Sequence, residues 1–262
     1  MSPSCGCEKP SMTKFYPTRQ LGPNGPAVSA IGLGAAAISG AFYGKAEKSE
    51  IFKMLSFAAD RGVTFWDTSD YYGDSEAIIG DWFTETGRRS EIFLATKFGA
   101  SDLSDGPNKG QISSKPPYIK QAIQRSLKML KTDYIDLYYQ HRVDKDVPIE
   151  IVLETLRPYV ESGTIKWLGL SECSAATLRR AKAVPGVGAK VIAAQMEYSP
   201  FEVGIETNGF LDVAKEAGVA VVAYSPLGRG LSRADTAVQP TSTKTTCDAA
   251  FLDFQTKISP RI

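Results

Sequence analysis

Histidine and cysteine are scarce in this sequence, which limits the kinds of site that the chain can build. The 262 residues include 1 histidine and 4 cysteines. The cysteines, Cys5, Cys7, Cys173 and Cys247, are spaced too unevenly for a disulfide framework or for paired metal ligands. We therefore expect reduced thiols and no bound metal, and we interpret the Cys5 and Cys7 pair as part of a disordered tail, residues 1–14.

The sequence also lacks a charge imbalance and a long apolar run. Its 30 basic and 29 acidic residues give a formal net charge of +1, so no overall field attracts nucleic acid or an anionic membrane. The first 12 residues lack the apolar run of a signal peptide, and no later stretch reaches transmembrane length. We expect a cytoplasmic protein with a small-molecule partner, and neither nucleic acid nor membrane as a partner.

From Val28 to Tyr224 the sequence repeats one plan, in which a short apolar run is followed by a turn, an amphipathic stretch and a glycine. In residues 47–61, for example, Ile51 and Leu55 share one face, and Gly62 suits a left-handed helix cap. The apolar runs show no polar alternation, which is typical of strands buried on both faces of a parallel sheet. This rhythm predicts alternating strands and helices.

The apolar runs predict about seven strands, near residues 30–33, 63–66, 92–96, 135–139, 165–170, 191–194 and 219–223. The fold class is therefore α/β, a TIM (β/α)8 barrel, which needs eight strands and is incomplete here. We expect the barrel to span residues 15–231 and an irregular tail rich in Ser, Thr and Ala to follow at 232–262. The open barrel would expose two edges, through which we expect self-association.

A turn signal and one further proline add two predictions about local structure. Residues 19–29 contain Pro23-Asn24-Gly25-Pro26, which predicts the turn of a small hairpin ahead of the first barrel strand. Pro158 falls within the helix expected at 149–162 and should kink or shorten it, because an interior proline removes a backbone donor.

Polar residues stand where the apolar runs end. In a parallel barrel these carboxyl ends converge on one face, where the active site lies. The polar residues in question are Asp67, Lys97, His141, Ser171, Gln195 and Tyr224.

Proton-donor chemistry suits three of the residues near these strand ends, Asp67, Tyr72 and Lys97. Tyr72 follows Asp67 closely enough to reach the same face as Lys97. An ammonium that is held by a carboxylate stabilises a nearby phenolate, which makes a tyrosine a usable general acid. His141 stands where it could donate a hydrogen bond to a substrate carbonyl.

Each residue also has a purely structural interpretation. Asp67 could cap a helix, Lys97 could be a solvated strand end, His141 a satisfied core residue and Tyr72 a packing residue. Their joint arrangement favours catalysis over these separate roles.

Several spaced motifs resemble the aldo-keto reductase family. The matching segments are residues 66–73 (WDTSDYYG), 94–97 (LATK), 133–141 (DYIDLYYQH) and 223–230 (AYSPLGRG). The resemblance implies a catalytic tetrad of Asp67, Tyr72, Lys97 and His141 and the reduction of an aldehyde or ketone to an alcohol.

The resemblance also implies NADPH as cofactor, with NADH as a possible substitute. Ser171 and Gln195 would hold the nicotinamide carboxamide, and Tyr224 would stack on the ring. The other contacts implied are Gly34 in the first loop and, near the pyrophosphate, Ser225, Leu227, Gly228 and Arg229. Glu172 stands where many family members carry Asn.

A dinucleotide-binding motif at residues 32–37 (GLGAAA) is a rival signal. It requires an acidic residue about 20 positions further on, at the end of the second strand. Residues 52–57 contain none, and Asp67 lies too far along the chain. We therefore do not expect a Rossmann fold.

Three interpretations of the activity stay open: a working reductase, a truncated relative that only binds a cofactor or partner, and another TIM-barrel enzyme. Family members normally continue for several dozen residues, and that segment holds the 2′-phosphate of NADPH. We therefore expect weak binding with little preference between NADPH and NADH.

Overall fold

The computed structural model describes residues 16–39, 46–107 and 109–228. The predicted tails, 1–14 and 232–262, lie outside these residues, as does Arg229. The chain divides into two compact units, Met1–Pro226 and Leu227–Ile262, and the architecture below is that of the first.

The centre of the first unit is a sheet of 7 parallel strands, each paired with the next one along the chain. The strands are β3 Gly32–Gly34, β4 Phe65–Asp67, β5 Phe93–Phe98, β6 Ile135–Gln140, β7 Ile165–Ser171, β8 Val191–Glu197 and β9 Ala220–Tyr224. This confirms the predicted fold class and each expected strand to within a few residues. β3 and β9 are the outer strands of this sheet.

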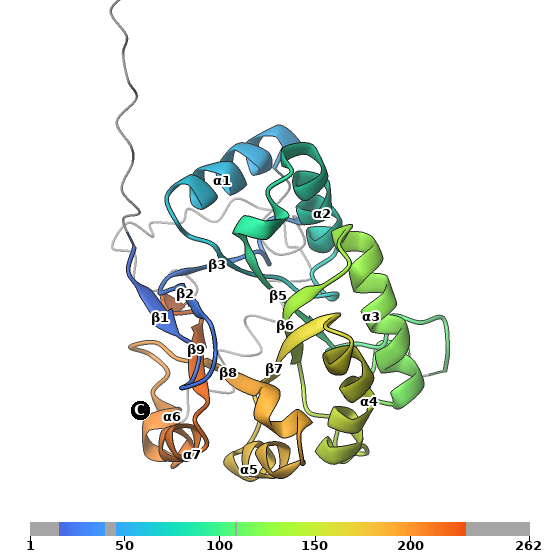
Figure 1. Ribbon diagram of the computed structural model, residues 1–262, viewed down its shortest axis with the longest axis vertical. Coiled ribbons are helices and arrows are strands. Elements are labelled where there is room, and N and C mark those ends of the chain that lie inside the picture. Colours follow the sequence, from blue (N-terminus) through green and yellow to red (C-terminus); the bar gives the residue numbers. More distant parts are fainter. Residues whose placement is uncertain (1–15, 40–45, 108, 229–262) are drawn as a thin grey trace, which may run out of the picture. The chain divides into compact units, whose positions relative to one another are not determined.

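Helices follow one another along the outer side of the strands (Figure 1). They are α1 Lys48–Asp60, α2 Ser75–Thr86, α3 Pro116–Leu130, α4 Ile149–Glu161, α5 Ala175–Ala183, α6 Gly204–Thr207 and α7 Phe210–Glu216, with short 3-10 turns η1 Arg89–Glu91 and η2 Val187–Lys190. The spacing of apolar residues explains how they dock, since Ile119, Ile123 and Leu130 form the fully buried stripe of α3. No helix in the described part of the chain is both long and apolar enough to cross a membrane.

Pro158 was predicted to kink or shorten α4, and the structure shows that it does not shorten the helix. The helix continues through Pro158 to Glu161, and the Ser162 amide donates to the Pro158 carbonyl at 3.0 Å. Pro158 lies in the last turn, so few backbone bonds depend on it, and the buried residues Leu153 and Leu156 hold the helix against the barrel.

The predicted hairpin is present and covers the amino ends of the strands. β1 Thr18–Gln20 pairs antiparallel with β2 Ala27–Ser29. The Ser29 hydroxyl accepts from the Phe65 amide at 3.0 Å, at the start of β4. A Cβ on Gly22 would come within 2.4 Å of the Gly218 carbonyl oxygen, so this close approach requires glycine.

An apolar cluster fills the inside of the barrel next to the hairpin, at the amino ends of the strands. Leu21 and Val28 of the hairpin belong to it, together with the strand residues Phe65, Ala95, Leu137, Tyr139, Ile192 and Ala193. The carboxyl ends of the strands therefore remain as the accessible face.

Candidate active site

The predicted site residues gather at the carboxyl ends of the strands. Asp67, Ser171 and Tyr224 end β4, β7 and β9, Lys97 and Gln195 lie near the ends of β5 and β8, and His141 directly follows β6. Parallel pairing places them at one edge of the sheet, since Ser171 lies beside Gln195 and Gly34 beside Asp67.

Lys97 and Asp67 form an ion pair at the base of the site. The Lys97 ammonium is fully buried and also donates to the Thr68 carbonyl at 2.9 Å. Burial by itself lowers the pKa of Lys97, but the charge of Asp67 and the contact with Tyr72 outweigh it, so the pKa is raised. Lys97 therefore stays charged in the interior, as a buried ammonium can only with a carboxylate partner.

Tyr72 lies beside this ion pair. Its ring centre is 5.0 Å from Lys97 Nζ, and a hydrogen bond with Tyr72 contributes to the raised pKa of Lys97. The ring meets that of His141 edge-on, with 5.7 Å between the ring centres. The four residues of the predicted tetrad thus form one connected group, in which Lys97 and His141 are buried and Asp67 and Tyr72 are half-buried.

His141 is a neutral hydrogen-bonding group. Burial, followed by the charges of Lys97 and Arg142, lowers its pKa to about 2. Its Nδ1 lies 3.0 Å from the Ser69 hydroxyl. Among the residues that the structure describes, no group of histidine, cysteine and acidic side chains is arranged to hold a metal ion.

Gln195 takes part in the same network. Its amide nitrogen donates to Asp67 Oδ2 at 2.8 Å, so Asp67 is held by Lys97 on one oxygen and by Gln195 on the other. The buried Ser171 hydroxyl lies next to Gln195 in register and accepts from Arg142 at 3.4 Å. A hydroxyl and an amide side by side suit a ligand that carries a carboxamide.

Gly34 and Tyr224 frame the space above these groups. A Cβ on Gly34 would meet no atom within 4 Å, so the end of β3 borders open space. Tyr224 is half-buried, and its hydroxyl lies 3.4 Å from a Glu197 oxygen. Burial, followed by the charges of Glu172 and Glu197, raises the pKa of Tyr224, so the ring stays neutral.

Glu172 has a structural role at the end of β7. Its backbone is left-handed, with φ of 52°, a conformation in which Asn is more common than Glu. Its carboxylate accepts from the Glu197 amide at 2.9 Å and so ties β7 to β8.

The structure says less about the other predicted cofactor residues, which are Ser225, Leu227, Gly228 and Arg229. Ser225 follows β9 with φ of 51°. Leu227 and Gly228 belong to the second compact unit, which is not positioned relative to the tetrad, and Arg229 lies outside the described residues.

Sequence reasoning missed the contacts behind the tetrad. Besides Ser69, these include the buried Asp70, which Arg125 holds at 2.9 Å, and Glu76, which accepts from Thr96 at 2.6 Å. Burial raises the pKa of Asp70 to about 6 and that of Glu76 to about 7. No sequence spacing signals these pairs, because their partners lie on other elements.

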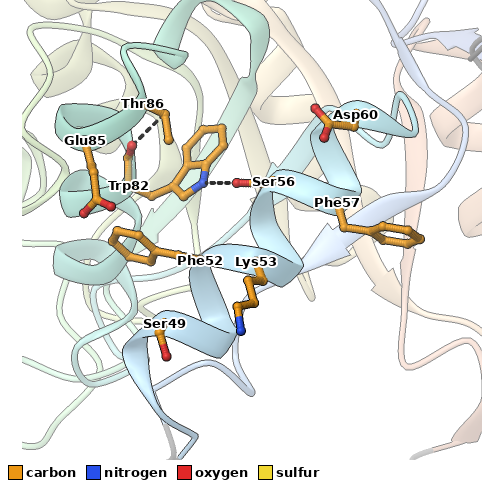
Figure 2. Close-up of a pocket in the computed structure, with 9 residues that line it drawn as sticks. All are labelled: Ser49, Phe52, Lys53, Ser56, Phe57, Asp60, Trp82, Glu85 and Thr86. Atoms are coloured by element: carbon orange, nitrogen blue, oxygen red, sulfur yellow. Dashed lines mark hydrogen bonds between the residues drawn. The ribbon is translucent and has the colours of Figure 1, made fainter. Parts of the chain in front are cut away.

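A hollow of about 500 Å³ lies on the outer surface between α1 and α2 (Figure 2). Phe52, Phe57 and Trp82 contribute its apolar lining, and the Trp82 ring nitrogen donates to the Ser56 hydroxyl at 3.0 Å. None of the tetrad residues lines it, so it is separate from the site above.

The fold and the tetrad place the chain among barrel proteins with a lysine, carboxylate, tyrosine and histidine at the carboxyl ends of their strands. The model of the Aldo/keto reductase family matches residues 30–254. The chain belongs to this family.

Two curated relatives show the same degree of similarity. The chain is 46% identical over 222 residues to aldo-keto reductase str7 of Strobilurus tenacellus and 46% identical over 220 residues to aldo-keto reductase yakc of Schizosaccharomyces pombe, whose name includes NADP(+). In each case the match covers 82% of this chain and 62% of the relative. The chain thus spans less than two thirds of the length of these relatives.

Solved structures agree with the fold. Aldo-keto reductase AKR11C1 from Bacillus halodurans, in its holo form, superposes with a TM-score of 0.70 at 28% identity, over 82% of this chain and 68% of that one. The thermostable aldo-keto reductase Tm1743, in complex with the inhibitor epalrestat, gives 0.69 at 25% identity, over 92% and 80% of the two chains.

Proposed function

We propose that this protein reduces an aldehyde or ketone to an alcohol, with NADPH as the reductant and Tyr72 as the general acid. The observation that carries the proposal is the buried Lys97 ammonium, which Asp67 holds and Tyr72 contacts. Membership of the aldo/keto reductase family and the NADP(+) in the name of the yakc relative support it.

The side chains divide the proton chemistry among themselves. Tyr72 donates its hydroxyl proton to the carbonyl oxygen as that oxygen gains negative charge. Lys97 stabilises the resulting phenolate, and Asp67 keeps Lys97 charged and in place. His141, being neutral, orients the carbonyl through a hydrogen bond and does not compete as an acid.

The cofactor, when bound, supplies the hydride that the carbonyl carbon accepts. Ser171 and Gln195 would hold its carboxamide, since their polar groups are adjacent in register. Tyr224 would pack against the nicotinamide ring, and Gly34 would leave room for it. Ser225, Leu227, Gly228 and Arg229 would lie along the pyrophosphate, and NADH could substitute for NADPH.

The decisive experiment compares two neighbouring tyrosines. Purified protein should oxidise NADPH in the presence of a reactive aromatic aldehyde. Tyr72→Phe should lower turnover by about 10² or more, the usual contribution of a general acid. Tyr71→Phe is the matched control, because Tyr71 is 48% exposed and lies outside the tetrad.

Fluorescence titration with NADPH separates binding from catalysis. Tyr72→Phe should bind NADPH as the unchanged protein does. Full turnover in the Phe variant would exclude Tyr72 as the acid. NADPH binding with no turnover in either form would indicate the alternative, a cofactor-binding or partner-binding relative without activity.

The other expectations on partners and location stay predictions. Self-association would use the outer strands β3 and β9, whose backbone edges could pair with another chain. Sedimentation analysis over a range of concentrations would detect it. We also keep as predictions a carbonyl compound as the small-molecule partner, the cytoplasmic location and the barrel limits 15–231.

A further inference from the structure

Ser69 is a fully buried hydroxyl in contact with His141. It lies in the loop after β4, whereas His141 follows β6, and its Oγ is 3.0 Å from His141 Nδ1. The Asp70 amide donates to the Lys97 carbonyl at 3.1 Å, which fixes this loop against β5, the strand between β4 and β6. The backbone of the next residue therefore holds the serine in place.

Two proton arrangements could satisfy this contact. In the first, the Ser69 hydroxyl donates to Nδ1, and the imidazole proton is on Nε2. In the second, Nδ1 donates to Ser69, and the Ser69 proton must go to its other neighbouring acceptor, Asp70 Oδ1, at 3.4 Å. That distance is long for a hydroxyl donor, whose preferred length is about 2.7 to 2.8 Å.

The surroundings of the Ser69 oxygen agree with the first arrangement. The Tyr71 amide donates to this oxygen at 3.1 Å and uses one of its two acceptor lone pairs, so the two arrangements differ in where the hydroxyl proton goes. His141 Nδ1, at 3.0 Å, is the nearer of its two acceptors.

We propose that Ser69 is a positioning residue that fixes the tautomer of His141, with the ring proton on Nε2. Nε2 is then a donor that can meet a carbonyl oxygen, whereas the opposite tautomer would present a lone pair and repel that oxygen. The use of this donor rests on the proposed reductase function, but the tautomer does not. A neutral ring, as the lowered pKa of His141 indicates, makes the choice of tautomer matter, because an imidazolium would carry both protons.

The tautomer can be measured directly, because the sequence contains a single histidine, His141. Labelling with ¹⁵N-histidine gives a single ring in the nitrogen spectrum of the whole protein. We expect Nε2 to show the shift of a protonated nitrogen and Nδ1 that of an unprotonated one, unchanged from pH 6 to 8. A protonated Nδ1, or two tautomers in comparable amounts, would overturn the proposal without any variant.

Variants test whether Ser69 is the cause. Ser69→Ala should shift the ring to a mixture of tautomers, whereas Ser69→Thr keeps the hydroxyl and should keep Nε2 protonated. Ser75→Ala is the matched control, since Ser75 is as fully buried and its hydroxyl contacts Thr68 and the Ala35 carbonyl instead. An unchanged spectrum in folded Ser69→Ala would show that Ser69 does not set the tautomer.

Kinetics provide an independent readout. Ser69→Ala should lower kcat by about 10- to 100-fold, the cost known for losing a partner that orients a metal-bound histidine, with the KM for NADPH unchanged. A fall in kcat with no change of tautomer would make Ser69 a merely structural residue and contradict the proposal. If the nitrogen spectra are as expected but the unchanged protein turns over no carbonyl, the proposed function fails and the role of Ser69 stands.

Discussion

The two ends of the parallel sheet each hold an aspartate, a cation and a tyrosine, but the groups are connected differently. At the carboxyl end, Lys97 holds Asp67, and the half-buried Tyr72 lies beside them. At the amino end, Arg89 donates to Asp136 at 2.8 Å, and Tyr134 lies beside that pair. The same chemical groups thus occur at both ends of one barrel.

The members of the amino-end group make several further contacts within the protein. Asp136 also accepts from Lys166 at 2.9 Å and from the Leu94 amide at 3.0 Å. The Tyr134 ring is covered by both cations, with Arg89 Cζ at 3.9 Å and Lys166 Nζ at 3.8 Å from its centre. These contacts tie η1, β5, β6 and β7 together and stabilise the barrel.

The carboxyl-end group lies beside a neutral histidine, and Gly34, which pairs with Asp67 in register, borders open space. Both tyrosines are half-buried, so the difference lies in their neighbours. Tyr134 contacts two cations that have structural partners, whereas Tyr72 contacts the Lys97 ammonium and a neutral histidine. In TIM barrels the carboxyl face carries the chemistry and the amino face contributes stability. Matched substitutions at the two ends test this distinction.

The largest effect is expected from Lys97→Met. Without the ammonium, nothing of comparable charge stabilises the Tyr72 phenolate, so turnover should fall by about 10² to 10⁴. NADPH oxidation measures the change, and fluorescence titration should show that the cofactor still binds. Turnover within tenfold of the unchanged protein would remove the distinction between the two ends.

Arg89→Met makes the same change at the amino end, where the effect is expected on stability alone. Arg89 is only 13% exposed and donates to Asp136, the Ile92 and Tyr134 carbonyls and the Thr132 hydroxyl. Breaking such a buried pair typically costs about 3 to 5 kcal/mol. Urea unfolding measures the loss, and turnover per folded molecule should stay unchanged. A selective loss of turnover would contradict a structural role.

Glu76→Gln tests a buried acid that lies behind the carboxyl-end site. Burial raises the pKa of Glu76 from 4.5 to about 7, against the opposing hydrogen bond from Thr96. Between these values the folded protein binds more protons than the unfolded chain, so the free energy of unfolding should fall as the pH rises from about 4.5 to 7. The shift corresponds to about 3 kcal/mol.

The Gln variant cannot titrate, so its unfolding free energy should depend less on pH. Asp70, whose pKa is raised to about 6, would still contribute part of the slope. Urea unfolding at pH 5 and pH 8 gives the comparison, and turnover should change little. A slope equal to that of the unchanged protein would show that Glu76 is ionised or solvated in the folded state.

Lys166→Met should have the smallest effect. Lys166 pairs with Asp136, but its side chain is 46% exposed, and partly exposed ion pairs contribute about 1 kcal/mol or less. The melting temperature should therefore fall by much less than in Arg89→Met. A loss as large as that of Arg89→Met would mean that both cations are needed equally at the amino end.

Most of the fold could be predicted because its signals are local. Apolar runs separated by amphipathic stretches indicated the seven strands of the sheet, and the turn at Pro23 to Pro26 indicated the hairpin. The shortening predicted at Pro158 was wrong, because the cost of a proline depends on how many backbone bonds follow it and on what the helix packs against.

The pattern of apolar residues also indicated which polar residues end the strands, since the strand limits follow from it. How those residues pair is known from the three-dimensional structure alone. The contact of Ser69 with His141 joins positions 72 apart in the sequence, and that of Gln195 with Asp67 joins positions 128 apart. Hydrogen bonds depend on distances of a few tenths of an ångström between separate strands, and no local pattern along the chain carries that information.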